Sequence, residues 1–258
     1  MIPYRDENET IRTPVVTYLI VALNAVAWLA LQGAGGSPGL PESVCNLGLI
    51  PGELTGQAAP GSSFAMGDGL ACATDPGMQV SHIFTSMFLH GSWMHIIGNM
   101  WFLWIFGNNI EDSMGRLRFV AFYLLSGVGA ALAQVMLNPS SIIPMVGASG
   151  AISGVMGAYV ILFPRVKVYT FIPLGFYLTT VALPAWVMLG YWMLLQVLGG
   201  ARDLARSGSG GVAFGAHIGG FVVGLALIKL FARRDYLAQH QAGHWRPRHL
   251  GFDRSQWR

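Results

Sequence analysis

Apolar residues are grouped along this chain into six long runs, separated by polar stretches. The runs cover residues 15–32, 93–110, 118–137, 147–164, 173–198 and 212–232. A helix needs about 17 to 25 apolar residues to cross the hydrocarbon core of a bilayer, and these runs reach that length. The pattern therefore predicts an all-α polytopic membrane protein with six transmembrane helices.

The composition fits this prediction. Hydrophobic residues make up 53% of the 258 residues, charged residues make up only 10%, and the mean hydropathy is +0.51. A soluble domain carries about 25% charged residues, which cover its water-facing surface. The net charge of +3 is small, and we expect the basic residues to mark membrane topology rather than to bind nucleic acid.

The positions of Lys and Arg predict that both termini are cytoplasmic. Six spans place both ends of the chain on one side, and placing them inside puts 13 of the 15 Lys and Arg residues in the cytoplasm. These are Arg5, Arg12, Arg116, Arg118, Arg165, Lys167, Lys229, Arg233, Arg234, Arg246, Arg248, Arg254 and Arg258. Arg202 and Arg206 alone lie outside, in agreement with the positive-inside rule.

This topology divides the chain into a cytoplasmic tail, 1–14, a membrane domain, 15–232, and a basic cytoplasmic tail, 233–258. The N-terminal tail contains acidic residues, and the first apolar run is longer than that of a signal peptide, so we expect an uncleaved first span. Short loops and the lack of a transit peptide favour a bacterial inner (plasma) membrane.

The first loop, 33–92, is predicted to be external because it contains no Lys or Arg. It is rich in Gly, Pro and Ser, and loops of this length are usually functional or disordered. Both cysteines of the chain, Cys45 and Cys72, lie in it. An oxidising compartment favours a disulfide between them, and two free thiols are the alternative.

Four polar side chains stand out inside the apolar runs, where polar groups are costly in a membrane and indicate functional positions. His95 and Asn99 share one face of the second run, Ser149 opens the fourth, and His217 lies early in the sixth. His95, Ser149 and His217 each lie 16 residues before a charged residue at the inner end of their run. Because 16 helical residues extend roughly 24 Å, we expect these groups at one level, just below the outer face.

Glycines in the fourth and sixth runs predict that these two spans pack closely, since small residues four apart allow helix contact in lipid. They are Gly150, Gly154, Gly220 and Gly224. Close packing would let the Ser149 hydroxyl reach an imidazole nitrogen of His217, and a base that takes the proton turns a serine into a nucleophile. Ser149 follows Pro144 and Gly147, so we expect it at a free helix N-terminus that stabilises an oxyanion.

Other interpretations of the same residues stay open at this point. The glycine faces are compatible with packing alone, and a serine in a membrane helix often bonds its own backbone. A zinc site could draw on His82, His90, His95 and His217, but no carboxylate or cysteine has helpful spacing. Ser153 is a second candidate nucleophile, although it lies a turn deeper and lacks the free helix N-terminus. The sequence GASGA differs from the G-x-S-x-G elbow of soluble hydrolases.

Taken together, these residues resemble the rhomboid family of intramembrane serine proteases over roughly residues 80 to 230. The matching motifs are His95-x-x-x-Asn99, Glu111-x-x-x-Gly115, Gly147-Ala148-Ser149-Gly150, and Ala216-His217 with Gly220 and Gly224. Each motif is weak alone, whereas their order, spacing and topology together are specific.

The resemblance implies a Ser–His dyad that cleaves transmembrane segments of membrane proteins near the outer membrane face. Ser149 would be the nucleophile and His217 the general base, while the Ser149 N–H, His95 and Asn99 would form the oxyanion site. The implied partners are transmembrane protein substrates and membrane lipid, with no metal or cofactor. Glu111 is implied to be structural and to tie the second span to the following loop.

One position departs from the family pattern. Relatives often carry an aromatic residue four positions after the serine, where its ring supports the histidine, and this chain has Ser153. A hydrogen bond from Ser153 is one substitute for that ring.

The run 138–146 contains two prolines and cannot be helical throughout. Since non-helical backbone at membrane depth must be buried or line a wet cavity, we expect a short fourth span beneath a water-filled pocket open to the outside. The fifth span, with Pro184 near its middle, is the candidate for a movable gate. Two other function classes are an inactive rhomboid-like protein that binds membrane clients and a small-solute transporter. Inactive relatives usually lack the serine or the histidine, and a transporter would favour internal repeats and paired charges.

Overall fold

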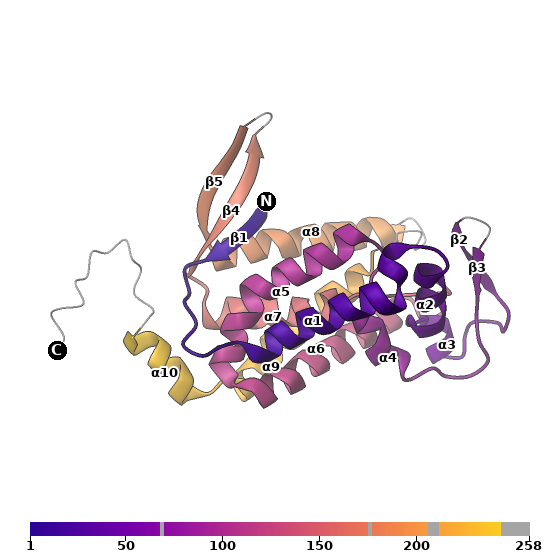
Figure 1. Cartoon of the computed structure of the whole chain (residues 1–258), viewed down its shortest axis with the longest axis horizontal. Helices are drawn as coiled ribbons and strands as arrows, with labels where there is room; N and C mark the ends of the chain where they lie inside the picture. Colours follow the sequence, from indigo (N-terminus) through magenta and orange to yellow (C-terminus); the bar gives the residue numbers. More distant parts are fainter. Residues whose placement is uncertain (68–69, 175–176, 206–211, 244–258) are drawn as a thin grey trace.

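The computed structural model describes residues 1–67, 70–174, 177–205 and 212–243, and long helices packed side by side form its body (Figure 1). Within these residues the long helices are α1 (Val15–Val26), α5 (Trp93–Met114), α6 (Arg116–Leu137), α7 (Ser149–Leu162), α8 (Ala185–Ala205) and α9 (Phe214–Phe231). A π-helical turn, Ala27–Leu31, extends α1, and a short α10 (Arg234–Gly243) follows α9. Their order follows the six predicted apolar runs.

Two helices of the described residues, α6 and α9, are long and apolar enough to cross a membrane by length and composition alone. The apolar helices Val15–Leu31 and Ser149–Leu162 are shorter. The number of spans and the side on which the termini lie therefore stay predictions.

The predicted loop 33–92 has secondary structure of its own. It contains the helices α2 (Gly39–Leu47), α3 (Pro51–Leu54) and α4 (His82–Thr85), the 3-10 turns Gly33–Gly35 and Ser86–Phe88, and a hairpin of β2 (Ser63–Gly67) and β3 (Leu70–Ala73). A disulfide joins Cys45 of α2 to Cys72 of β3. The loop is therefore a folded cap at one end of the bundle (Figure 1).

The all-α prediction is wrong at the opposite end, where three strands form an antiparallel sheet in the order β1–β4–β5. The strands are β1 (Ile2–Asp6), β4 (Lys167–Leu174) and β5 (Tyr177–Pro184), and the β4–β5 hairpin projects from the bundle in Figure 1. The predicted fifth span, 173–198, is accordingly wrong in its first half, because α8 begins at Ala185. Apolar β-branched and aromatic residues in this segment raise its hydropathy like a span but favour a strand.

Pro184 was expected near the middle of a spanning helix and instead is the last residue of β5. A proline lacks the N–H that a helix interior requires, whereas it is tolerated just before the first turn. Helix α8 therefore has no proline kink within Ala185–Ala205.

Helix α7 lies at the centre of the bundle, against α5, α6 and α9, with every residue from Gly150 to Tyr159 buried. The glycine faces bring α7 and α9 into backbone contact. A Cβ added to Gly220 would lie 2.0 Å from the carbonyl oxygen of Gly150, and one added to Gly224 would lie 2.0 Å from that of Gly154. These glycines therefore set the distance between the helix that carries Ser149 and the helix that carries His217.

Glu111 is structural in a different way from the one expected. Its buried carboxylate accepts hydrogen bonds from the backbone N–H groups of Val16 and Thr17, at 3.0 and 2.8 Å, and from the Thr17 hydroxyl at 2.8 Å. It therefore caps the N-terminus of α1 instead of tying α5 to the loop that follows, and a carboxylate there also suits the positive end of the helix. Gly115 makes the turn from α5 to α6 with φ +85°, a conformation that favours glycine.

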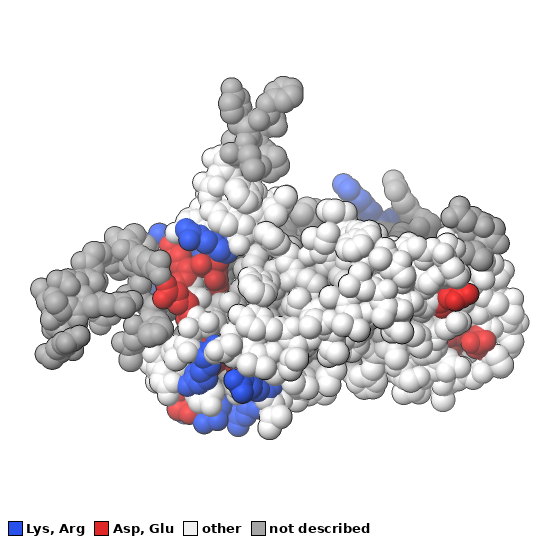
Figure 2. All heavy atoms as spheres, viewed as in Figure 1, with Lys and Arg blue, Asp and Glu red and all other residues white. Residues whose placement is uncertain are grey.

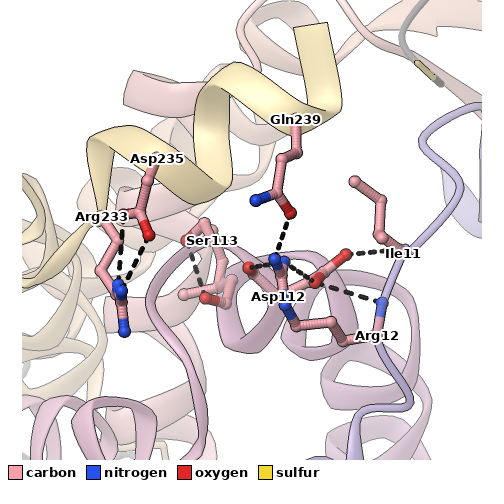
Figure 3. Close-up of polar contacts among 8 residues, drawn as sticks. Ile11, Arg12, Asp112, Ser113, Arg233, Asp235 and Gln239 are labelled. Carbon is pink, nitrogen blue, oxygen red and sulfur yellow. Dashed lines mark hydrogen bonds and ion pairs between the residues drawn. The ribbon is translucent and has the colours of Figure 1, made fainter. Parts of the chain in front are cut away.

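The N-terminal tail, predicted as a separate polar segment, is docked onto the bundle. Figure 3 shows the Asp112 carboxylate accepting hydrogen bonds from the backbone of Ile11 and from the Arg12 guanidinium, which forms an ion pair with it at 3.0 Å. Arg12 also bonds Gln239 of α10. The far part of the predicted basic tail, 244–258, lies outside the described residues.

Charged side chains gather at this sheet-bearing end of the molecule, while the side of the bundle seen in Figure 2 is almost free of them. Large apolar side chains are exposed along the bundle, including Leu23, Trp104 and Val222. An apolar belt between a charged end and a folded cap is the surface expected of a protein embedded in lipid.

Candidate active site

A cavity of about 990 Å³ opens between α5, α7, α8, α9 and the segment 138–146. The non-helical segment lies along its wall, as the two prolines predicted. Ser149 and His217 both line the cavity.

The Ser149 hydroxyl and His217 Nε2 are 2.8 Å apart, within hydrogen-bonding distance. Ser149 is the first residue of α7, and His217 lies in the first turns of α9, so the glycine contact of these two helices sets their separation. Gly147 enters α7 with φ +129°, and its N–H donates to the Ser86 carbonyl at 2.9 Å. A side chain there would meet the His95 ring at 2.8 Å, so this position needs glycine.

Two side chains of α8 hold the His217 ring from the other side. Nδ1 of His217 lies 2.7 Å from Oε1 of Gln196, and the Trp192 ring lies beside the imidazole with 5.9 Å between ring centroids. Ser153 does not take this role, because its hydroxyl donates to the Ser149 carbonyl at 2.6 Å within α7. Sequence reasoning missed Gln196, although a lone polar residue in an apolar run was the available signal.

His95 and Asn99 present hydrogen-bond donors to the same cavity. The Gly91 N–H donates to His95 Nδ1 at 3.3 Å, so a neutral His95 ring carries its proton on Nε2, the nitrogen nearest Gly147. The amide nitrogen of Asn99 is buried and has no hydrogen-bond partner among the described residues. An unpaired buried donor is costly, and an anionic oxygen in the cavity would satisfy it.

The N-terminus of α7 adds further donors. The first N–H groups of a helix have no partner within it, and its positive end favours negative charge. The N–H of Ser149 is among these groups. The arrangement therefore offers a nucleophile, a base and a donor set around one point.

The loop before α5 is held by Gln32, which sequence reasoning also missed. Its side-chain amide donates to the His90 carbonyl and accepts from the His90 N–H, both at 2.8 Å. The His90 ring in turn packs edge-on against His95, with centroids 5.1 Å apart. Gln32 therefore fixes the backbone from which His95 projects.

The zinc alternative finds no site in the described part of the chain, where no group of three or more His, Cys, Asp or Glu residues lies close enough to hold a metal ion.

Comparison with known protein families shows to which family the chain belongs. The Rhomboid domain model matches residues 77–234. The chain belongs to the rhomboid family. Rhomboids are integral membrane proteins and usually intramembrane proteases, and the matched region contains all four polar residues predicted from the apolar runs.

Curated relatives agree with this assignment. Rhomboid-like protease 5 of Toxoplasma gondii is 33% identical over 144 residues, which cover 54% of this rhomboid and 15% of the relative. Rhomboid-like protein 11, chloroplastic, of Arabidopsis thaliana is 28% identical over 159 residues, covering 58% and 51%. Rhomboid protein 1, mitochondrial, of Saccharomyces cerevisiae is 28% identical over 174 residues, covering 63% and 46%. The chain thus spans about half or less of the length of these relatives, and organellar proteins among them give no support to a bacterial host.

Proposed function

We propose that this rhomboid is an intramembrane serine endopeptidase that cleaves transmembrane segments of other membrane proteins near the outer membrane face. The observation that carries the proposal is the 2.8 Å contact between Ser149 Oγ and His217 Nε2 at the wall of a 990 Å³ cavity. A serine becomes a useful nucleophile only beside a base, and this pair has that geometry.

Catalysis begins when His217 Nε2 takes the hydroxyl proton of Ser149 and Oγ attacks the scissile carbonyl carbon. The resulting tetrahedral oxyanion collapses when imidazolium gives its proton to the leaving amine, so the C–N bond breaks and an acyl-enzyme remains. Water then attacks the ester, His217 takes a water proton, and that proton returns to Ser149 as the carboxyl product leaves.

The oxyanion would accept hydrogen bonds from the Ser149 N–H, His95 Nε2 and the Asn99 amide. The unpaired state of the Asn99 amide supports this role, because a donor aimed where charge develops stabilises the transition state more than the substrate.

For topology, we propose six spans with cytoplasmic termini, so that the sheet and α10 lie inside and the loop 33–92 lies outside. Lys and Arg side chains are among the charged groups that gather at the sheet end, and they support this orientation. Helix α7 has 14 residues against 22 in α5 and α6, so it is about 12 Å shorter. This difference suits a nucleophile below the outer surface, reached by water through the cavity. We propose that the protein resides in a bacterial plasma membrane, and the short loops are the only basis for this proposal.

Helix α8 is the candidate gate for substrate entry, now without the proline kink. It contributes Trp192 to the lining of the cavity, and α5 contributes Met94 and Phe102 to the same lining. Cross-linking α5 to α8 should abolish cleavage of a transmembrane substrate, and full cleavage by the cross-linked protein would rule out the gate.

The test of function is cleavage of a reconstituted transmembrane substrate by the wild type, Ser149→Ala and His217→Ala. Both variants should lose at least about 1000-fold in activity, since removing a nucleophile or its base removes the covalent route. Cleavage by Ser149→Ala at the wild-type rate would refute the proposal, and a wild type that binds clients without cleaving them would indicate an inactive rhomboid-like protein.

A further inference from the structure

We propose that Gln196 of α8 is a positioning residue that fixes the tautomer of His217, and so makes catalysis depend on the place of α8. The inference rests on the proposed function. It starts from the 2.7 Å contact between Gln196 Oε1 and His217 Nδ1, which joins two helices on the side of the ring away from Ser149.

The orientation of the Gln196 amide is fixed by its second contact. Its nitrogen donates to the backbone carbonyl of Trp192, one helical turn back, at 3.4 Å. The amide nitrogen is thus turned toward α8's own backbone, and the carbonyl oxygen Oε1 is the atom that faces His217. An amide oxygen is only an acceptor, so the His217 atom opposite it must be a donor.

The tautomer follows from this acceptor. With its proton on Nδ1, a neutral imidazole has a lone pair on Nε2, and Nε2 is the nitrogen that lies 2.8 Å from the Ser149 hydroxyl. The opposite tautomer would aim an N–H at Ser149 and could not take its proton. Gln196 therefore selects the form of His217 that acts as a base.

Helix α8 contributes an aromatic ring beside His217 as well as a hydrogen-bond acceptor. Trp192 lies beside the imidazole on the same helix that carries Gln196, with ring centroids 5.9 Å apart. Ser153, at the position where an aromatic ring was expected, donates its hydrogen bond within its own helix, to the Ser149 carbonyl. The side chains that support the His217 ring in this chain therefore come from α8, whereas the family pattern predicted a ring from α7.

Because Gln196 lies on α8, the orientation of His217 depends on the helix that we propose as the gate. Ser149 is on α7 and His217 on α9, and glycine contacts lock these helices together. Gln196 is on α8, whose outward face is exposed at Leu194, Leu195 and Leu198. If α8 moves outward to admit a substrate, His217 loses its acceptor, and it regains the productive tautomer when α8 closes.

Three variants test the positioning role in the full-length protein, by kinetics on a reconstituted transmembrane substrate. Gln196→Leu should lower kcat by roughly 10- to 100-fold with KM within about twofold, since it removes the acceptor but not the cavity. Gln196→Glu should restore most of kcat at high pH, and the acidic limb of its pH–rate profile should move to higher pH, because a carboxylate stabilises imidazolium. Leu195→Ala, next in the chain and exposed, is the matched control and should stay near the wild type.

Among the described residues that line the cavity, His95 is the second ionisable ring. The same profiles are therefore recorded in a His95→Ala background, where the displacement caused by Gln196→Glu should persist. Wild-type kcat in Gln196→Leu, or an unshifted profile in Gln196→Glu, would overturn the positioning role while leaving the dyad intact. The proposed function itself fails separately, through full cleavage by Ser149→Ala. Thermal unfolding of each variant shows whether a variant with a lower kcat is still folded. If Gln196→Leu does not fold, the pH–rate profile of Gln196→Glu alone tests the positioning role.

Discussion

At the scale of single residues, the site is a set of polar groups whose partners fix what each can do. Nδ1 of His95 accepts from Gly91 while Nδ1 of His217 faces Gln196, so neutral forms of the two rings carry their protons on opposite nitrogens. One ring thereby presents an N–H to the cavity and the other a lone pair to the Ser149 hydroxyl, which is the arrangement that the proposed mechanism needs. Identical side chains take different roles because their neighbours differ.

Asn99 gives the sharpest residue-scale prediction. Asn99→Ala should lower kcat by about 100-fold and change KM little, because an oxyanion donor acts mainly in the transition state. Steady-state kinetics on a transmembrane substrate measure both constants. A rise in KM with an unchanged kcat would mean that Asn99 binds substrate and not the oxyanion.

Asp6, in the sheet outside the proposed spans, predicts a pH-dependent stability. Burial raises the pKa of its carboxyl from 3.8 to about 7, and the negative charge of neighbouring Glu7 also raises it, although a hydrogen bond from Tyr159 acts in the opposite direction. The folded protein then holds a proton that the unfolded chain releases above about pH 4. Stability should therefore fall as pH rises from about 4 to 7.

Thermal unfolding in detergent at pH 5 and pH 8 measures this effect, with Asp6→Asn as the comparison. The wild type should lose more stability than the variant between the two values. Equal losses would show that Asp6 titrates normally in the folded protein.

At the scale of elements, sequence patterns located the polar residues that line the cavity better than they located the ends of helices and strands. Ser149, His217, His95 and Asn99 were found because each is polar within an apolar run, and their depths could be compared along helices. Gln196 has the same signature, but its role depends on where α8 packs, which no local pattern contains. Residues 173–184 were misassigned because hydropathy does not separate an apolar strand from a span, and the partner of Glu111 lies 94 and 95 residues away in α1.

The close contact of α7 with α9 predicts that one added methyl group lowers both stability and activity. Gly224→Ala would place a Cβ 2.0 Å from the Gly154 carbonyl oxygen, and backbone cannot move aside without separating the two helices. We expect a loss of about 1–3 kcal/mol in stability and a larger loss of activity, since Ser149 and His217 would move apart.

Gly190→Ala on α8 is the matched control, because an added Cβ there meets nothing within 4 Å. It should leave thermal stability unchanged or slightly higher, as alanine is the better helix former. Similar behaviour of the two variants would contradict the close helix contact.

At the scale of the whole molecule, the proposed orientation predicts which end of the bundle faces the cytoplasm. The two native cysteines are joined in a disulfide, so single added cysteines report their own positions. Gln57→Cys in the loop 33–92 should react with a membrane-impermeant maleimide on intact cells. Arg234→Cys, at the start of α10, should react only after lysis, and the reverse pattern would invert the topology.

The overall arrangement of helices also offers a way for water and a membrane substrate to meet at Ser149. A short central helix and a cavity bounded by non-helical backbone would admit water from one side, and the proposed movement of α8 would admit a transmembrane segment from the other. In the mechanism we propose, Ser149 is the activated nucleophile of this arrangement.

The most direct measurement is labelling of the intact, membrane-embedded protein with a fluorophosphonate, followed by mass spectrometry of the modified peptide. We expect one adduct, on Ser149, that is absent in Ser149→Ala and strongly reduced in His217→Ala. Labelling of Ser149→Ala to the same extent as the wild type, or of another serine such as Ser153, would contradict it.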